Sequence, residues 1–331
     1  MVRVLTFACV IAVHTVSTVN PLDSVPAGCV VMLLHFTREA FFVLTAFVLM
    51  HRYAAAGPAV LPFWRHRFLL VGVPYVVWTV IYTGLQQVPV PVLDPVATLV
   101  RNLLTGTGWF HLYFLLVSLQ FYLVFPAFRW LLRATRGHHG WLLAASAALQ
   151  VGIDVALHEL DSPYAGSVFV SYPFFLVLGG VVAMHRDQVD AWIRTHTRTV
   201  VGAALATGGA AEAWYQLTVP AVGAIVATDV FQPVMIPWVV AVCALFWAAG
   251  AAWQPGWARR ASDRSFGVFL VHPAILWALT VGGTSQLIPA PWSSVAAYAA
   301  TVTGSLLIVE GLRRTPLSLV LTGRSRPRST A

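Results

Sequence analysis

Residues 4–20 read VLTFACVIAVHTVSTVN and contain no Asp, Glu, Lys or Arg. A helix of about 20 mainly apolar residues crosses the hydrocarbon core of a bilayer, so this run predicts a membrane-spanning helix. Nine similar runs follow, near residues 31–51, 68–86, 110–132, 141–158, 167–185, 199–219, 231–252, 265–283 and 293–312. The sequence therefore predicts an all-α fold, a polytopic membrane bundle of about ten transmembrane helices. The weakest of these runs are 141–158 and 199–219, which contain Asp154 and Glu212.

The composition supports a protein that faces lipid over most of its surface. Of the 331 residues, 58% are hydrophobic and only 10% are charged, whereas soluble domains carry about 25% charged residues. All 20 basic residues are arginines, and the formal net charge is +8. Such a balance can indicate nucleic acid or anionic lipid. Because these arginines lie in short loops, we interpret them as orientation signals and expect the bilayer, and no nucleic acid, as a partner.

Arginines are distributed unevenly among the predicted connections. The connections after the second, fourth, sixth and eighth spans carry twelve: Arg52, Arg65, Arg67, Arg129, Arg133, Arg136, Arg186, Arg194, Arg198, Arg259, Arg260 and Arg264. The alternate connections carry only Arg101 among basic residues. Because positively charged loops stay in the cytoplasm, this pattern predicts an even number of spans, two cytoplasmic termini and a multi-pass protein of the cell membrane.

The chain is expected to form one transmembrane domain over residues 1–313. Residues 314–331 are polar and rich in arginine, and they predict a basic, disordered cytoplasmic tail. The three cysteines, Cys9, Cys29 and Cys243, lie far apart in or beside apolar segments. Their spacing indicates neither a disulfide framework nor a zinc site, so we interpret them as small buried apolar residues and predict no metal.

The first span carries two ionisable groups, Arg3 and His14. Eleven steps of about 100° place both on nearly one face of a helix, with a rise of about 16 Å between them. Ionisable groups inside a membrane are costly and often functional. The pair suits a long polyanionic ligand that enters from the cytoplasm and brings a reactive end to His14. The alternatives are that Arg3 anchors the helix end at the interface and that His14 is a packed core histidine.

Four further motifs combine aromatic, basic and histidine residues. Residues 38–47 read REAFFVLTAF, with adjacent opposite charges before a phenylalanine pair. Residues 63–68 read FWRHRF and are followed by Pro74-Tyr75. Residues 111–115 read HLYFL, and residues 265–273 read SFGVFLVHP.

In these motifs and in their order the sequence resembles the acyltransferase-3 family of integral membrane acyltransferases. The resemblance runs from Arg3 to about Arg313. Arg3 and His14 match the family's R-x10-H, and Glu39 falls where members often have Asp. Residues 41–47 are similar to its FFVLSGF, residues 111–115 to its HLWFL and residues 265–272 to its SYGIYLVH. The FWRHRF segment with Pro74-Tyr75 resembles an exopolysaccharide-modifying branch.

The chain departs from the family in two places. Many members have R-x-x-R before the third-span proline, but Arg65 and Arg67 form R-x-R here. Leu70 and Val71 occupy the positions where a second arginine would fall. Residues 45–46 are Thr-Ala in place of Ser-Gly, a pair that packs less closely.

The resemblance implies an O-acyltransferase that moves an acetyl-like group from cytoplasmic acyl-CoA, with acetyl-CoA as the expected donor, to a hydroxyl of an extracytoplasmic sugar, polysaccharide or glycolipid. An imidazole with a reference pKa near 6.5 is matched to taking the hydroxyl proton. We therefore predict His14 as the base, or as a nucleophile that forms an acyl-histidine. Glu39 either orients His14 or pairs with Arg38.

The remaining site residues follow from the same comparison. Arg3, Arg65 and Arg67 are expected to hold the phosphates of acyl-CoA, because a guanidinium forms paired hydrogen bonds with phosphate. His111, Tyr122 and His272 are expected on the acceptor side, and the alternative for His111 and His272 is a hydrogen-bonded histidine of the core. A partner protein that completes the transfer is possible under this interpretation.

Three other interpretations stay open at this point. Membrane-buried His, Asp and Glu also suit a transporter or flippase of a glycan or lipid intermediate, although no inverted repeat is visible. A haem or metal protein would use His14, His111 and His272. A member of the family without activity would serve as a partner subunit.

Overall fold

The computed structural model describes residues 1–331 except 54, 89–93, 161–163, 284–286 and 327–331. The described residues form helices and no strand. The helices are α1 Val2–Val19, α2 Val25–Leu34, α3 Thr37–Tyr53, α4 Val60–Arg67, α5 Val73–Gln86, α6 Pro95–Thr105, α7 Tyr113–Ala134, α8 His139–Leu160, α9 Pro173–Met184, α10 Arg186–Thr195, α11 Thr197–Ala227, α12 Met235–Ala252, α13 Gly256–Val281, α14 Trp292–Arg314 and α15 Ser318–Thr322. A π-helical turn, Phe68–Gly72, joins α4 to α5, and short 3₁₀ turns precede α9.

Each of the ten predicted spans falls on a helix, and the all-α membrane bundle is confirmed. Among the described residues, eight helical stretches are long and apolar enough to cross a membrane: Val2–Val19, Val25–Tyr53, Val60–Gln86, Tyr113–Ala134, His139–Leu160, Met235–Ala252, Gly256–Val281 and Trp292–Arg314. The run near 167–185 contains only the shorter α9, and the run near 199–219 lies within α11. Ten crossings and two cytoplasmic termini remain predictions.

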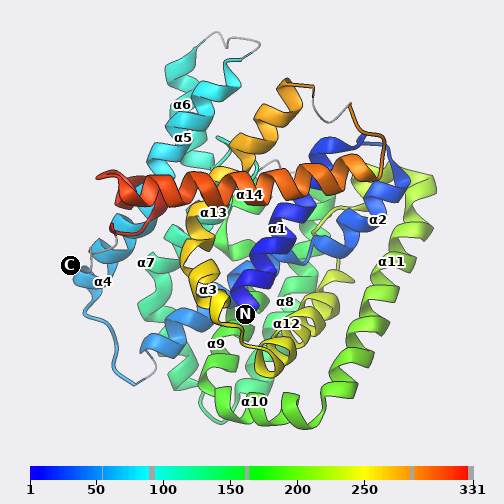
Figure 1. The fold of residues 1–331 in the computed structure, drawn as a ribbon. Helices are drawn as coiled ribbons and strands as arrows, with labels where there is room; N and C mark the ends of the chain where they lie inside the picture. The colour runs from blue at the N-terminus through cyan, green and yellow to red at the C-terminus, as the bar shows by residue number, and fades with distance from the viewer. Residues whose placement is uncertain (54, 89–93, 161–163, 284–286, 327–331) are drawn as a thin grey trace.

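Helix α1 lies inside the bundle. It packs against α2, α3, α12, α13 and α14, and Figure 1 shows it running through the middle of the molecule with α14 lying across it. Its buried side chains include Phe7, Val10 and Ile11. The helix that carries Arg3 and His14 is therefore surrounded by protein over much of its surface.

Helices α3 and α9 approach closely because of one glycine. A Cβ added at Gly179 would lie 2.1 Å from the carbonyl oxygen of Val43 on α3, so no larger residue fits without moving a backbone. This contact holds α3, which carries Arg38 and Glu39, against α9.

Helix α7 holds α4 through a backbone group that a proline leaves free. Pro126 lies inside α7 and lacks an N–H, so the carbonyl of Tyr122 loses its usual helical donor. The indole Nε1 of Trp64 donates to that carbonyl at 2.9 Å. This bond places the end of α4, and with it Arg67, beside Tyr122.

Part of the predicted disordered tail is folded. Residues 318–322 of the stretch 314–331 form α15, which packs against α5, α13 and α14. Ser318 and Thr322 are almost fully buried, and Trp78 Nε1 donates to the carbonyl of Leu321 at 3.0 Å. The apolar residues of this segment find a packing surface that the sequence alone does not show. Residues 327–331, with Arg328, lie outside the described residues.

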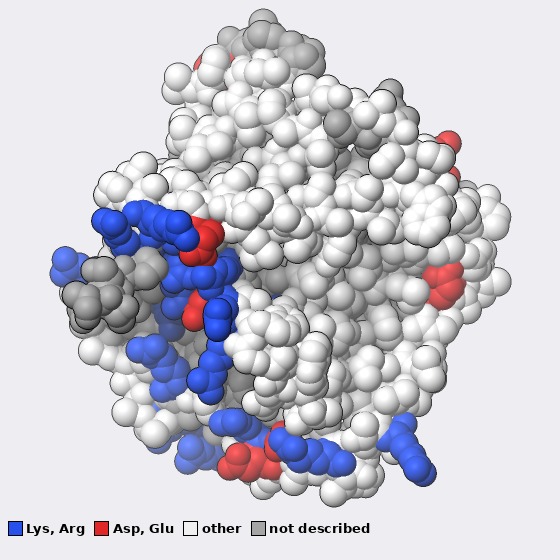
Figure 2. Space-filling model, in the orientation of Figure 1, with Lys and Arg blue, Asp and Glu red and all other residues white. Residues whose placement is uncertain are grey.

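Charges gather at one side of the molecule. Figure 2 shows arginine side chains clustered where the chain ends, and others at the base near α10, while large areas of the same face carry no charge. Many large apolar side chains elsewhere are exposed, among them Leu104, Leu205 and Leu217. This distribution is typical of a bundle whose uncharged belt meets lipid.

Candidate active site

Three predicted histidines from distant parts of the chain come together. His14 lies on α1, His111 in the turn before α7 and His272 on α13. The ring centroids of His14 and His272 are 5.5 Å apart with the rings nearly parallel, and those of His111 and His272 are also 5.5 Å apart. No group of three or more possible metal ligands is arranged around an ion site within the described residues.

Local sequence sets the tautomer of His272. Pro273 has no N–H, so the carbonyl of Phe269 loses its helical donor. Nδ1 of His272 lies 2.8 Å from that oxygen, and because a carbonyl only accepts, Nδ1 donates. In the neutral ring Nε2 is then the unprotonated nitrogen, and it is buried without a hydrogen-bond partner. The Val-His-Pro order thus leaves a free basic nitrogen in the histidine cluster.

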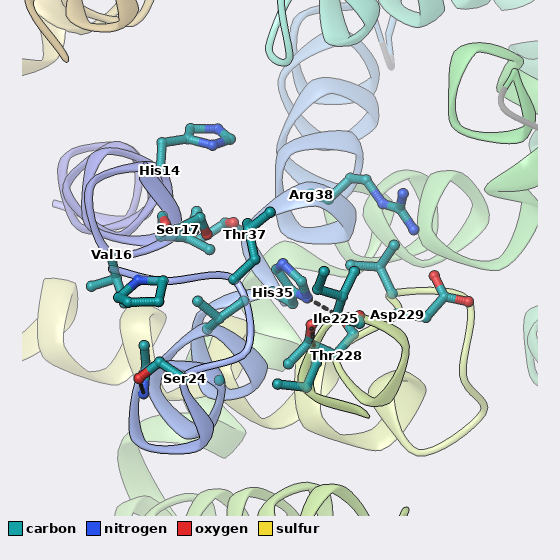
Figure 3. Close-up of a pocket in the computed structure, with 18 of the residues that line it drawn as sticks. His14, Val16, Ser17, Ser24, His35, Thr37, Arg38, Ile225, Thr228 and Asp229 are labelled. Carbon is teal, nitrogen blue, oxygen red and sulfur yellow. Dashed lines mark hydrogen bonds between the residues drawn. The ribbon is translucent and has the colours of Figure 1, made fainter. Parts of the chain in front are cut away.

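His14 opens onto a cavity of about 390 Å³, here called the His14 cavity. Its polar lining includes Ser17, Ser24, Thr37, His35, Arg38, Thr228 and Asp229. Figure 3 shows His14 and Ser17 on α1, with Arg38 across from them and His35 beside the Thr228–Asp229 turn. His35 Nδ1 is hydrogen-bonded to the carbonyl of Thr228, which joins α2 to the end of α11. Of the three clustered histidines, His14 is the one that lines this cavity.

A second cavity of about 810 Å³ adjoins the first and is called the Trp109 cavity. The two share Arg38, Tyr113, Ile225, Asp229 and Val230 in their linings. Its lining includes the aromatic rings of Trp109 and Phe110 and the hydroxyl groups of Thr107 and Ser167. Their lining lies in and beside the connections after the first, third, fifth and seventh predicted spans, which the arginine pattern assigns to the extracytoplasmic side.

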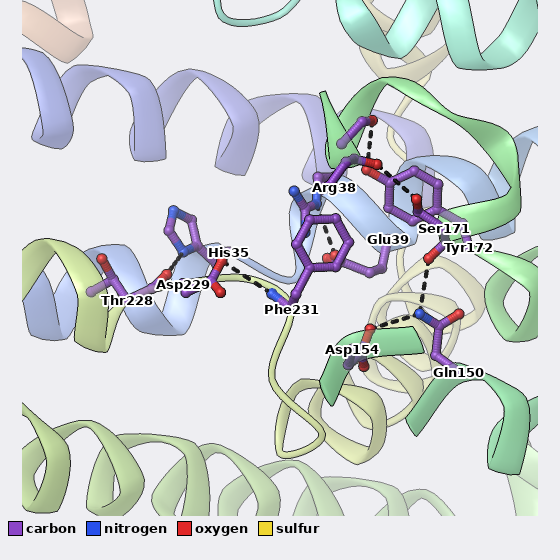
Figure 4. Close-up of polar contacts among 12 residues, drawn as sticks. His35, Arg38, Glu39, Gln150, Asp154, Ser171, Tyr172, Thr228, Asp229 and Phe231 are labelled. Carbon is purple, nitrogen blue, oxygen red and sulfur yellow. Dashed lines mark hydrogen bonds and ion pairs between the residues drawn. The ribbon is translucent and has the colours of Figure 1, made fainter. Parts of the chain in front are cut away.

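Glu39 is paired with Arg38. The Nε of Arg38 donates to Oε1 of Glu39 at 3.0 Å, and both residues are buried, 8% and 2% exposed. The guanidinium also stacks over Phe231, with Cζ 4.2 Å from the ring centroid, as Figure 4 shows. Its Nη2 is buried without a partner where the two cavities meet. The geometry favours the pairing role for Glu39 over direct orientation of His14.

Replacing Glu39 with alanine is expected to destabilise the protein by about 3–5 kcal/mol, because Arg38 would remain as a buried charge without its partner. Thermal unfolding of the purified variant in detergent measures the loss. The double variant Arg38→Met with Glu39→Leu removes both charges and should recover most of it. An unchanged unfolding temperature for Glu39→Ala would contradict this account of the pair.

The third cavity, of about 480 Å³, is lined by arginines from four parts of the chain. Arg3 comes from α1, Arg52 from α3, Arg67 from α4 and Arg324 from beyond α15, and His66 lies among them. Its described lining contains no acidic residue. Arg67 Nε is buried without a hydrogen-bond partner. A cavity lined by several cations and by no carboxylate is typical of a polyanion site, and we call this the arginine cavity.

Two predicted residues lie elsewhere than expected. Arg65 is exposed and does not line the arginine cavity. Tyr122, predicted on the acceptor side, lines the arginine cavity instead, with its ring centroid 5.6 Å from Cζ of Arg67. Residues two apart on a helix point in directions about 160° apart, which is why Arg65 and Arg67 do not share one cavity.

Phenylalanine rings fill the space between the arginine cavity and the histidines. Phe7 and Phe41 line the arginine cavity, and Phe114 lines the His14 cavity. Phe41 lies 5.2 Å from Phe114, and Phe269 lies 5.6 Å from Phe7 and 5.1 Å from His111, between ring centroids. We call Phe7, Phe41, Phe114 and Phe269 the phenylalanine cluster. Its rings pack between the arginine cavity and the His14 cavity.

Sequence reasoning did not assign Arg38, Asp229, Arg52 or Arg324 to the site. Arg52 and Arg324 resembled the other loop arginines, which mark orientation, and nothing in their spacing set them apart. Arg38 carried a signal, since a charged residue inside a span is costly. The sequence analysis considered Arg38 only as a pairing partner of Glu39.

One protein-family model covers most of the residues of this site. The family model Acyl_transf_3, described as an acyltransferase domain, matches residues 1–310. Comparisons with curated proteins and with solved structures find no match. The matched region includes the histidine cluster, the phenylalanine cluster and the arginines of the arginine cavity except Arg324. The chain belongs to the acyltransferase-3 family of integral membrane acyltransferases.

Proposed function

We propose that this membrane acyltransferase moves an acyl group from cytoplasmic acyl-CoA to a hydroxyl of an extracytoplasmic carbohydrate or glycolipid. One observation carries the proposal: a single helix, α1, presents Arg3 to the arginine cavity and His14 to the His14 cavity. The two cavities therefore lie at different depths of one bundle. A reaction between substrates from opposite sides of a membrane requires such an arrangement.

The arginine cavity suits the donor. Coenzyme A carries a diphosphate and a 3′-phosphate, and arginine binds such groups through paired hydrogen bonds. Arg52 and Arg67 belong to the connection that the arginine pattern assigns to the cytoplasm, where acyl-CoA is found. The buried Nε of Arg67, without a partner in the protein, is a donor group available to a phosphate.

The narrow thioester arm of the donor would extend from the arginines toward the histidines. Its path leads between the rings of the phenylalanine cluster, which would move apart around it and exclude water from the thioester. Exclusion of water favours transfer to the acceptor over hydrolysis. The rise of about 16 Å from Arg3 to His14 along α1 matches the need for an extended arm rather than a compact substrate.

His14 would act as the base. The acceptor hydroxyl attacks the thioester carbonyl carbon as the imidazole takes its proton, a carbon–oxygen bond forms, and the carbon–sulfur bond breaks. The thiolate of CoA leaves and receives the proton from the imidazole. In the variant with a covalent intermediate, the imidazole nitrogen attacks the thioester carbon first, the carbon–sulfur bond breaks and the thiolate of CoA leaves. The hydroxyl then attacks the acyl carbon, the carbon–nitrogen bond breaks, and the proton of the hydroxyl passes to the freed imidazole.

The joined His14 and Trp109 cavities suit the acceptor. Serine, threonine and arginine side chains provide hydrogen-bonding groups, and Trp109, Phe110 and Tyr113 provide ring faces. The resemblance to an exopolysaccharide-modifying branch adds a polysaccharide as one acceptor class within this proposal.

The test uses the purified full chain in detergent with acetyl-CoA labelled in the acetyl group. We expect release of free CoA thiol that depends on added acceptor carbohydrate, together with label in that carbohydrate as an alkali-labile ester. Absence of both across a panel of cell-surface glycans and glycolipids, with a folded protein, would reject acetyl-CoA as the donor. In sealed proteoliposomes of the same protein, movement of an acceptor across the bilayer without ester formation would support the flippase alternative instead.

A further inference from the structure

The segment after α15 returns the end of the chain to the arginine cavity. Gly323, Arg324 and Ser325 all line that cavity. The segment is held by α15, whose packing against α5, α13 and α14 is described above. The position of Arg324 is therefore set by the fold rather than by a free tail.

The turn at Gly323 explains how the segment reaches this place. Its φ is +62°, in the left-handed region that favours glycine. A Cβ added there would lie 2.7 Å from the carbonyl oxygen of Leu70 and 2.5 Å from a ring carbon of Phe266. The hydroxyl of Ser318 donates to the carbonyl of Arg324 at 2.7 Å and closes the turn. Glycine at 323 thus lets the chain pack directly against the start of the third predicted span.

Arg324 retains hydrogen-bonding capacity that the protein does not use. Its nearest acidic group is Asp263, at 3.9 Å between Nη2 and Oδ1, well beyond the 2.7–2.9 Å of a charge-assisted hydrogen bond. The side chain is 49% exposed, so a ligand can reach it. Leu70, against which the turn packs, also lines the cavity and brings no charge. Arg324, although it comes from the C-terminal segment, supplies a cation to the arginine cavity, which Leu70 also lines.

We propose that the C-terminal segment completes the donor site and that Arg324 binds a phosphate of the acyl donor. The inference rests on the proposed function, because it assigns a further residue to the same donor. The proposal gives the stretch after residue 313 a role in substrate binding. Arg324 would then supply the cation that is absent at position 70, where a second arginine of R-x-x-R would fall.

The experiment compares two donors in the full-length protein: acetyl-CoA, and S-acetylpantetheine, which lacks every phosphate. Arg324→Ala is expected to lower kcat/KM for acetyl-CoA by about 3- to 10-fold, a modest loss because the guanidinium is half exposed. For S-acetylpantetheine the same variant should match the wild type, since that donor has no phosphate to contact. Arg324→Lys should recover part of the loss, because lysine keeps the charge without the paired geometry.

Arg326→Ala is the matched control. It removes the same charge from the same segment, but Arg326 does not line the cavity, and we expect kcat/KM within about twofold of wild type. Equal losses for both donors, or equal losses in Arg324→Ala and Arg326→Ala, would overturn the proposal, because either result indicates a structural or purely long-range effect. A wild-type protein inactive with acetyl-CoA would instead reject the proposed donor, which keeps the two failures distinct.

Discussion

His14→Ala is expected to lower the rate of acyl transfer by at least about 100-fold, the contribution of a positioned base to catalysis. The reason is the position of the side chain: of the three clustered histidines, His14 is the one that lines the His14 cavity, where an acceptor hydroxyl would lie. The measurement is transfer of labelled acetyl from acetyl-CoA to carbohydrate by purified protein. Binding of CoA should be retained, because Arg3 and Arg67 remain in place.

Two comparisons make that result specific. His196→Ala changes an exposed histidine at the junction of α10 and α11 and should leave the rate unchanged. Rapid quenching without acceptor separates the two chemical routes, since only an acyl-histidine intermediate puts label on the wild-type protein. Normal transfer by His14→Ala at normal abundance would remove the proposed mechanism, whichever route is considered.

Arg67→Ala is expected to weaken CoA binding by about 10- to 100-fold. Hydrogen bonds to charged groups contribute about 1.5–3 kcal/mol, and each 1.4 kcal/mol is a tenfold change in affinity. Arg67 is placed to form such a hydrogen bond, because its Nε is buried without a partner in the protein and its side chain lines the arginine cavity. Calorimetry or displacement of a fluorescent CoA analogue measures the effect.

Arg65→Ala is the control for that variant. It removes an identical charge two residues away on α4, from a side chain that is exposed and lies outside the cavity. Its CoA affinity should stay within about threefold of wild type, since exposed charges contribute little. Similar losses in the two variants would mean that the arginines act only through their net charge. That result would reject the arginine cavity as a specific donor site.

The membrane bundle could be predicted from the sequence because a span in lipid is recognised from its own run of apolar residues, without knowledge of its neighbours. Each span must satisfy its own backbone hydrogen bonds, so apolar length alone marks a helix. Each of the ten predicted runs therefore coincides with helical residues. Not every run is a single α-helix: the run near 31–51 is divided between α2 and α3, and in the run near 167–185 only Pro173–Met184 is a continuous α-helix.

The candidate site could be predicted only where the relation between two residues is set within one helix. Helical periodicity predicts that Arg3 and His14 share a face of one helix, and in the structure each lines a cavity from α1. The same periodicity directs Arg65 and Arg67 about 160° apart on α4, and of the two Arg67 lines the arginine cavity. Tyr122 lies beside Arg67 because Trp64 of α4 donates to the Tyr122 carbonyl, a contact between distant segments that no local pattern predicts.

The sequence by itself determined the all-α membrane architecture, the distribution of charge and the alignment of Arg3 with His14, since each follows from composition or from one helix. Only the tertiary structure decided that His111 and His272 join His14, that Glu39 pairs with Arg38, and that Arg324 enters the arginine cavity. These are contacts between segments far apart in the chain, and helix packing selects them. A five-residue helix such as α15 is unstable in isolation, so its burial depends on surfaces that exist only after the bundle has formed.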